Sequence, residues 1–274
     1  MKISNRKSPE ERKKVFSFLF PALKSLFHRI RGGKLFSMLH ALFAFFLPRQ
    51  CPLCGGVPAD GTGNMFCADC LKKLHFVRTP ACPGCGGELS GILELCPDCL
   101  HSPGKRPWEK ALSVFVMEGA VKEVIYLFKY RNRPSLARPL GMLCAQSLLH
   151  SGIRPDVMTY TPLHWTRCLR RGYNQSELLV REMAKHVPWG VERLLKRRRL
   201  TRQQAHLGRK ERILNMRGAF RAVHPERFRG KKVLLVDDVL TTGATLSSAS
   251  EELLKNGASQ VFILVLARRS TDFS

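Results

Sequence analysis

The stretch that decides the fold is Val233-Leu-Leu-Val-Asp-Asp-Val-Leu-Thr-Thr-Gly-Ala-Thr245. Its first four residues are all apolar, which predicts a buried strand of a parallel sheet. Two carboxylates, Asp237 and Asp238, follow where that strand is expected to end. A turn then leads into a predicted helix over 246–256. In an open α/β sheet, ligands bind at the carboxyl ends of the strands, so this junction is the candidate site.

The turn consists of Thr241, Thr242, Gly243, Ala244 and Thr245. Backbone N–H groups of a glycine-containing loop at the start of a helix bind anions such as phosphate. Carboxylates beside such a loop repel phosphate, but they accept hydrogen bonds from sugar hydroxyls. The combination therefore indicates a ribose 5-phosphate as ligand. The alternative is an ordinary buried strand that ends in a polar turn.

The run 233–245 resembles the phosphoribosyl pyrophosphate (PRPP) motif of type I phosphoribosyltransferases. That resemblance implies that Asp237 and Asp238 hold ribose hydroxyls and that the 241–245 loop holds the 5′-phosphate. Purine-salvage members of that family carry an acid at the position of Thr241, where it is thought to act as a general base. Threonine has no pKa near neutrality that suits this role, so the sequence argues against purine salvage.

Eight of the ten cysteines form Cys-x-x-Cys pairs. The four pairs are Cys51/Cys54, Cys67/Cys70, Cys82/Cys85 and Cys96/Cys99. Twelve and ten residues separate the first two and the last two pairs, which is typical of small zinc ribbons. We therefore predict two structural zinc ions, each bound by neighbouring pairs, although the spacing also allows a crossed pairing. Residues 49–102 are too few for a large core, so the metal would supply folding energy.

Other uses of these cysteines agree less well with the sequence. A disulfide framework fits the count, but no cleavable secretory signal precedes it, and the predicted location is cytoplasmic. Redox-active Cys-x-x-Cys pairs usually occur singly, and not four times in one chain. Cys144 and Cys168 have no partner at ligand spacing. We predict that they are ordinary thiols, Cys144 buried on a helix and Cys168 in a loop.

The chain is strongly basic, with a formal net charge of +25. Residues 193–212 hold nine Lys or Arg against one Glu, including the run Lys196, Arg197, Arg198 and Arg199. Such a cluster predicts a phosphate-rich partner, single-stranded DNA in particular. The alternative is a solvated basic surface.

The first 43 residues mix charge with apolar residues and are predicted to be partly helical or disordered. The apolar run 39–47 is too short to cross a bilayer. A basic amphipathic helix in this extension could contact a membrane surface, or it could pack its apolar face on the zinc module or on the enzyme core.

Downstream of the cysteines, apolar patterns alternate between strand and helix periods. Strands are predicted over 111–117, 157–161, 231–236 and 260–267, helices over 120–130, 136–150 and 174–186, and a mobile loop with a short helix over 193–219. Alternating strands and helices predict a mostly parallel α/β sheet. Arg167, Arg170 and Arg171 lie in the predicted loop before residue 174, where their planar guanidinium groups suit a diphosphate. A solvated basic loop is the alternative.

Further short motifs recur in a fixed order along the chain. They are Pro48 with the ribbons, Lys129-Tyr130, Arg171-Gly-Tyr-Asn-Gln175, Thr201 to Gln204, Arg212 to Asn215, Gly218 to Phe220, and the run 233–245. In this order they resemble the ComF family, whose members are amidophosphoribosyltransferase-like proteins linked to natural competence. The resemblance implies a type I phosphoribosyltransferase fold over 106–274 and a double zinc ribbon over 44–105. Residues 1–43 lie outside the resemblance and are predicted to be a separate extension.

Three functions agree with this resemblance. The first is binding of PRPP with Mg²⁺, with transfer of the phosphoribosyl group to an unknown acceptor; the arginines at 167, 170 and 171 would then neutralise the departing diphosphate. The second is a single-stranded-DNA-binding factor for DNA uptake, in which the pocket is not catalytic. The third is a membrane-docked adaptor of the DNA-uptake machinery, which rests on the N-terminus alone.

Overall fold

The computed structural model describes residues 50–58, 66–89, 93–101, 106–199, 211, 215–216 and 218–269. The extension over 1–43 with its predicted membrane contact lies outside these residues. Residues 200–210 and 212–214 of the loop predicted over 193–219 also lie outside them. Residues 1–50 and 51–274 form two units, and the fold belongs to the second. Within the described ranges, no helix has both the length and the apolar character needed to span a bilayer.

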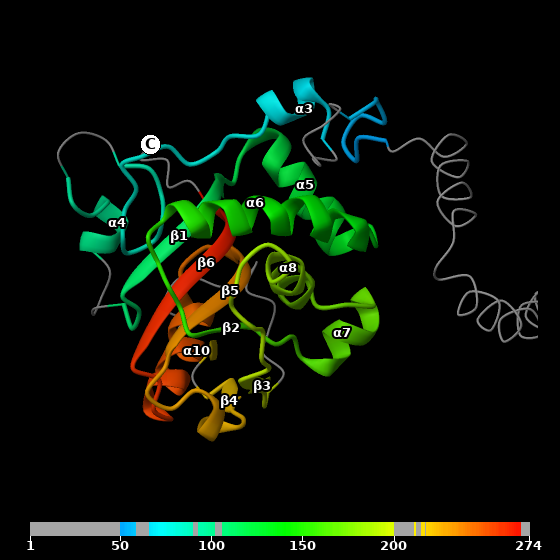
Figure 1. The fold of residues 1–274 in the computed structure, drawn as a ribbon. Helices are drawn as coiled ribbons and strands as arrows, with labels where there is room; N and C mark the ends of the chain where they lie inside the picture. The colour runs from blue at the N-terminus through cyan, green and yellow to red at the C-terminus, as the bar shows by residue number, and fades with distance from the viewer. Residues whose placement is uncertain are drawn as a thin grey trace, which may run out of the picture. The chain divides into compact units, whose positions relative to one another are not determined.

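A four-stranded parallel sheet lies at the centre of this unit, in the order β1-β6-β5-β2 (Figure 1). Its strands are β1 (Lys110–Val116), β2 (Val157–Tyr160), β5 (Lys232–Leu240) and β6 (Gln260–Arg268). All three strand pairings are parallel, which confirms the α/β class expected from the alternating pattern. The sequence predicts that β5 ends at Val236, but β5 pairs with β6 as far as Leu240. Asp237 and Asp238 therefore lie within the strand.

Helices cover both faces of the sheet (Figure 1). One face carries α5 (Gly119–Tyr130), α6 (Ala137–His150) and α8 (Gln175–Met183), and α10 (Ala244–Lys255) packs on the other. Side chains of β5 alternate between the two layers, as the period of a strand requires. Leu234 and Val236 join the core under α6 and α8, whereas Val233 and Leu235 join the core under α10. Short 3-10 turns lie at Pro134–Leu136 and Pro225–Arg227.

Two predicted loops contain regular structure instead. The arginine segment forms α7 (Trp165–Arg171), which begins after the His164 cap and ends at left-handed Gly172, φ 79°. Cys168 therefore lies on a helix and not in a loop. The region predicted to be a mobile loop, 193–219, contains the short strand β3 (Leu195–Arg197), which pairs antiparallel with β4 (Phe220–Ala222) directly after the region.

The cysteine segments pack along the free side of β1, around the short helices α3 (Ala68–Lys72) and α4 (Pro97–Leu100). Backbone hydrogen bonds join Val116 N to His75 O at 2.9 Å, Val77 N to Val114 O at 3.0 Å and Ala111 N to Pro83 O at 2.7 Å. The segments thereby satisfy polar groups that an edge strand would otherwise leave unpaired. The Cys51–Cys70 segment joins the core on the α6 side, and the Cys82–Cys99 segment joins the core on the α10 side.

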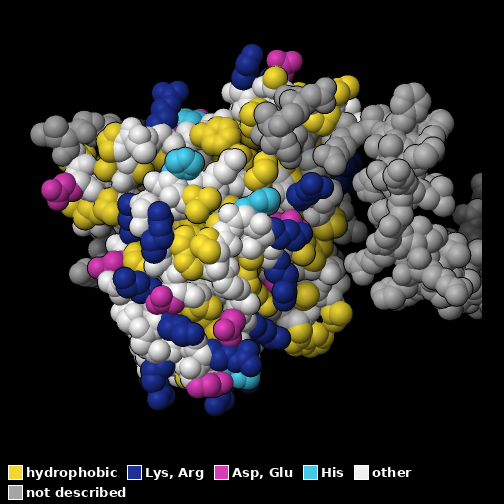
Figure 2. Space-filling view, in the orientation of Figure 1, with side chains coloured by type: hydrophobic (Ala, Val, Ile, Leu, Met, Phe, Trp, Pro, Cys, Tyr) yellow, Lys and Arg dark blue, Asp and Glu magenta, His cyan; other side chains and the backbone are white. Residues whose placement is uncertain are grey.

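The surface agrees with the basic composition. On the face shown in Figure 2, Lys and Arg side chains are widely spread, with Asp and Glu side chains set among them. Positive charge therefore extends beyond the run at 196–199.

Candidate functional site

Two clusters of four thiols occur among the described residues, and each joins neighbouring pairs. One contains Cys51, Cys54, Cys67 and Cys70, and the other contains Cys82, Cys85, Cys96 and Cys99. The sequential pairing is thereby confirmed over the crossed one. The sulfur atoms of each cluster lie within 4.8 Å of one another. Tetrahedral zinc with Zn–S bonds of about 2.3 Å places its sulfur ligands about 3.8 Å apart, so both clusters fit one zinc ion each.

Hydrogen-bond donors surround the thiolates, as a negatively charged zinc site requires. Gly56 N donates to Cys54 Sγ, and Cys96 N donates to Cys82 Sγ, both at 3.4 Å. At the second cluster Arg268 Nη2 lies 3.7 Å from Cys96 Sγ and 3.1 Å from Asp98 Oδ2. This guanidinium, which comes from the end of β6, offsets part of the negative charge of the thiolates.

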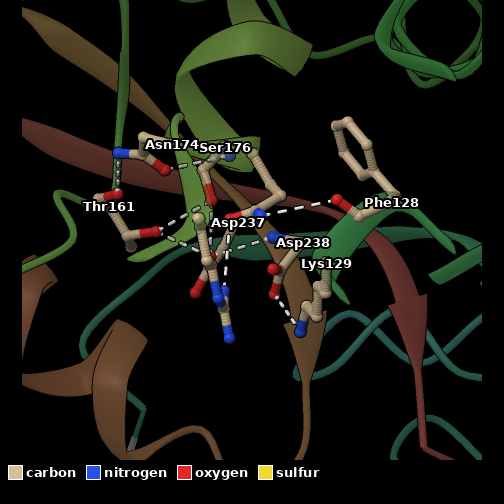
Figure 3. Close-up of polar contacts among 9 residues, drawn as sticks. Phe128, Lys129, Thr161, Asn174, Ser176, Asp237 and Asp238 are labelled. Atoms are coloured by element: carbon tan, nitrogen blue, oxygen red, sulfur yellow. Dashed lines mark hydrogen bonds and ion pairs between the residues drawn. The ribbon is translucent and has the colours of Figure 1, made fainter. Parts of the chain in front are cut away.

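The first carboxylate of the motif is buried, and one of its oxygens accepts three hydrogen bonds (Figure 3). Asp237 Oδ1 accepts from Thr161 Oγ1 at 2.6 Å, from Ser176 Oγ at 2.8 Å and from the backbone N–H of Asp238 at 2.9 Å. Asn174 caps α8 and donates to Thr161 O at 3.0 Å, which ties the ends of β2 and α8 together. Sequence reasoning missed Thr161 and Ser176, because both lie far from the motif in the chain.

Burial, followed by the neighbouring carboxylate of Asp238, raises the pKa of Asp237 to about 6, although its hydrogen bonds oppose the shift. The unfolded value is 3.8, so protonation favours the folded state and stability falls as pH rises through this window. When the pH falls from about 7.5 to about 5, the free energy of unfolding of the wild-type chain should rise by about 1 kcal/mol relative to that of Asp237→Asn, which cannot titrate at this position. Urea unfolding of both proteins measures this difference. Any pH dependence of zinc binding is the same in both proteins and therefore cancels. A difference that does not change with pH would contradict it.

The second carboxylate faces a lysine from another element. Asp238 Oδ1 lies 2.9 Å from Lys129 Nζ, and their side chains are only 15% and 18% exposed. Lys129 lies in the last turn of α5, beside the sheet end that carries the motif (Figure 3). The second carboxylate of the motif is therefore paired with an ammonium group from α5.

The loop of residues 241–245, which is predicted to bind phosphate, begins directly after β5. Gly243 adopts the left-handed conformation, φ 81°, and its carbonyl accepts from Ser247 N at 2.8 Å as α10 begins. Thr242 Oγ1 accepts from Ala244 N at 3.5 Å. Thr241 is exposed, and Thr245 is partly buried in the first turn of the helix. The loop therefore connects the end of β5, which carries both carboxylates, to the N-terminus of the twelve-residue helix α10.

The three arginines predicted to contact a diphosphate occupy α7, at positions 167, 170 and 171. The structure describes the side chain of Arg171 alone. Its guanidinium stacks 5.0 Å from the ring centroid of Tyr130 and donates to Gln175 Oε1 at 3.2 Å. Arg171 therefore contacts the residue that follows Lys129, the lysine paired with Asp238.

The basic run at 196–199 is not one uniform patch. Lys196, Arg198 and Arg199 are exposed, whereas Arg197 is partly buried and stacks 5.3 Å from the ring centroid of Phe220. Arg199 Nη2 donates to Asn215 O at 3.1 Å. The alternation follows from the strand geometry of β3, which sends neighbouring side chains to opposite faces.

The fold and these sites define the class, a double zinc ribbon joined to a phosphoribosyltransferase-type domain. The family model of the double zinc ribbon domain matches residues 42–100, and that of the phosphoribosyl transferase domain matches residues 173–272. Among solved structures, a glutamine PRPP amidotransferase from B. subtilis covers 51% of this chain and 30% of its own, at 21% identity and a TM-score of 0.36.

Relatives narrow this class to one family. The chain is 32% identical over 229 residues to DNA utilization protein YhgH of Escherichia coli (strain K12), across 81% of this chain and 98% of the relative. Competence protein F of Haemophilus influenzae is 32% identical over 213 residues, 75% of this chain and 91% of its own. Competence protein ComFC of Bacillus subtilis is 26% identical over 204 residues, 70% and 78% of the two chains. The chain belongs to the ComF family, which confirms the resemblance found in the sequence.

Proposed function

We propose that the carboxyl end of β5 binds a phosphoribosyl ligand, PRPP or a ribose 5-phosphate. The observation that carries the proposal is the placement of two carboxylates near the carboxyl end of β5, where a glycine-containing loop leads into α10. The N–H groups at the start of the helix attract phosphate, and the carboxylates accept hydrogen bonds from hydroxyl groups. A single ligand that carries both a phosphate and hydroxyl groups therefore provides partners for the helix start and for the carboxylates.

The geometry divides the work between the two carboxylates. One oxygen of Asp237 already accepts three hydrogen bonds, so Asp238 provides most of the contact to the ribose hydroxyls. Lys129, 2.9 Å from Asp238 Oδ1, orients this carboxylate. With PRPP, the arginines of α7 would neutralise the diphosphate, and Mg²⁺ would be held mostly by oxygens of the ligand. Transfer would then go to an acceptor that needs no general base, because Thr241 offers none.

Titration calorimetry with PRPP, with and without Mg²⁺, tests this proposal. The wild-type chain should bind, and Asp238→Asn should lower the affinity about ten- to a hundredfold, because a charged hydrogen bond contributes about 1.5–3 kcal/mol. Asp156→Asn is the matched control. Asp156 directly precedes β2 and accepts a hydrogen bond from the N–H of Lys232, which lies at the opposite end of β5 from the motif. Absence of binding to the wild-type chain, or equal affinities for the two variants, would refute the ribose site.

Binding of single-stranded DNA is the second candidate, and one surface favours it. Tyr126 and Tyr130 are exposed on α5, with ring centroids 5.5 Å apart. Arg131 stacks 5.6 Å from the centroid of Tyr126, as Arg171 does on Tyr130. Exposed aromatic rings between arginines are typical of surfaces that stack bases. The names of the relatives, a DNA utilization protein and competence proteins, support a role that involves DNA.

Replacing both tyrosines by alanine should weaken binding of single-stranded oligonucleotides at least tenfold, because each base stack contributes about 1–3 kcal/mol. The variant Tyr126→Phe/Tyr130→Phe keeps the rings and should bind nearly as well as wild type. Lys196→Glu with Arg198→Glu should instead reduce the salt dependence, since these exposed charges would contact phosphates. Fluorescence anisotropy at several salt concentrations separates the two effects. Equal affinity of the alanine and phenylalanine variants would rule out stacking on α5.

A further inference from the structure

Arg106 lies against the 241–245 loop although it belongs to the segment that joins the second zinc ribbon to β1. A Cβ atom added to Gly243 would come within 2.3 Å of Arg106 Nη1 and 3.4 Å of the Trp108 ring. The guanidinium and the indole therefore pack directly on the residue that caps α10. Gly243 has no side chain, and this permits the close approach.

The electrostatics of this contact are unfavourable on the side of the loop, although the guanidinium also interacts favourably with the Cys99 thiolate. The N-terminus of a helix carries a partial positive charge, so a cation there is repelled unless an anion lies between them. Arg106 Nε is also buried and has no hydrogen-bond partner in the part of the chain that the structure describes. A buried donor without a partner costs free energy. A phosphate at the loop would relieve both costs.

The second zinc ribbon holds Arg106 in this position. Its guanidinium lies 5.2 Å from the centroid of Trp108, and Trp108 Nε1 donates to Gly84 O at 2.9 Å. Gly84 in turn packs on Cys99, because a Cβ atom added there would lie 2.9 Å from Cys99 Sγ. A continuous set of contacts thus runs from the thiolate cluster through Trp108 to the 241–245 loop.

We infer that Arg106 binds the phosphate group held by the 241–245 loop, and that the second zinc ribbon positions it through Trp108. The inference rests on the proposed phosphoribosyl site and adds a residue outside the PRPP motif to it. Its consequence is that the zinc ribbon contributes directly to ligand binding, in addition to stabilising the fold.

Titration calorimetry with ribose 5-phosphate, combined with zinc analysis, tests the role of Arg106. Arg106→Gln should keep both zinc ions and lose about ten- to a hundredfold in affinity, as expected for loss of a charge-assisted hydrogen bond. Arg154→Gln is the matched control. Arg154 also stacks on a tryptophan, 5.9 Å from the centroid of Trp189, but precedes β2 at the opposite end of the sheet. Its loss should leave the affinity unchanged.

The possible outcomes distinguish this inference from the proposed function. If the wild-type chain binds neither ribose 5-phosphate nor PRPP, the phosphoribosyl site itself fails, and the role of Arg106 fails with it. If the wild-type chain binds and Arg106→Gln binds equally well, Arg106 alone is wrongly assigned. If Arg106→Gln loses zinc along with affinity, the arginine belongs to the metal site, which also overturns the inference. Ligand binding should further change the fluorescence of Trp108, and Trp108→Phe should remove that change.

Discussion

Replacing Cys85 by serine should release one of the two zinc ions and destabilise the phosphoribosyltransferase-type domain as well as the ribbon. Cys85 is fully buried, and its carbonyl accepts from Ser113 Oγ of β1 at 3.0 Å. Its cluster shares a hydrophobic core with α10 and β5. Structural zinc binding contributes about 10–16 kcal/mol in small zinc peptides, which is comparable with the whole stability of a typical domain, about 5–15 kcal/mol.

Metal analysis and thermal unfolding provide the measurement. We expect the zinc content to fall from two ions to one and the unfolding transition to shift far down or to disappear. Cys144→Ala is the control, because Cys144 is buried on α6 away from both thiol clusters. That variant should keep both zinc ions. A Cys85→Ser protein that loses zinc but retains an unchanged unfolding transition would show that the second ribbon is not coupled to the domain.

The other large effect is expected at Gly243. An alanine there would move Arg106 from its place and would strain a backbone with φ 81°. Ribose 5-phosphate affinity should fall more than tenfold, because the loop N–H groups and the guanidinium would both lose their alignment. The free energy of unfolding should fall by only about 1–2 kcal/mol, the cost of a left-handed residue with a side chain.

Gly152→Ala separates strain from the loss of the binding geometry. Gly152 has nearly the same backbone conformation, φ 76°, and no atom lies within 4 Å of an added Cβ. Both variants should therefore lose similar stability, and Gly243→Ala alone should lose ligand affinity. Calorimetry and urea unfolding of the pair provide the comparison. Equal affinities would mean that the conformation of Gly243 is irrelevant to binding.

Local sequence patterns predicted the sheet well. Each of the four strands lies within a few residues of its predicted range, because continuous apolar runs such as 233–236 have few alternatives to a buried parallel strand. Cysteine spacing predicted both thiol clusters for a similar reason, since ligands from neighbouring pairs are close along the chain. The family was also readable, because its motifs are short and contiguous.

Features that depend on distant contacts were missed. α7 exposes Trp165 and Leu169, so its apolar residues do not mark a buried face, and only Gly172 signals its end. β3 and β4 are three residues each and gain stability from their mutual pairing. The donors to Asp237 and the contact of Arg106 with the loop require the folded chain. The sequence therefore indicates the proposed ligand class, and the tertiary structure adds the residues that we propose to position the ligand.

The pairing of β1 with β6 has a consequence for how the chain folds during synthesis. These strands come from opposite ends of the domain, so their contact closes a loop that spans almost the whole domain and forms slowly. The ribbon contacts to β1, through His75, Val77 and Pro83, come from residues close in the chain. A nascent chain that has bound zinc can therefore hold β1 extended and cover one side of it before β6 has left the ribosome.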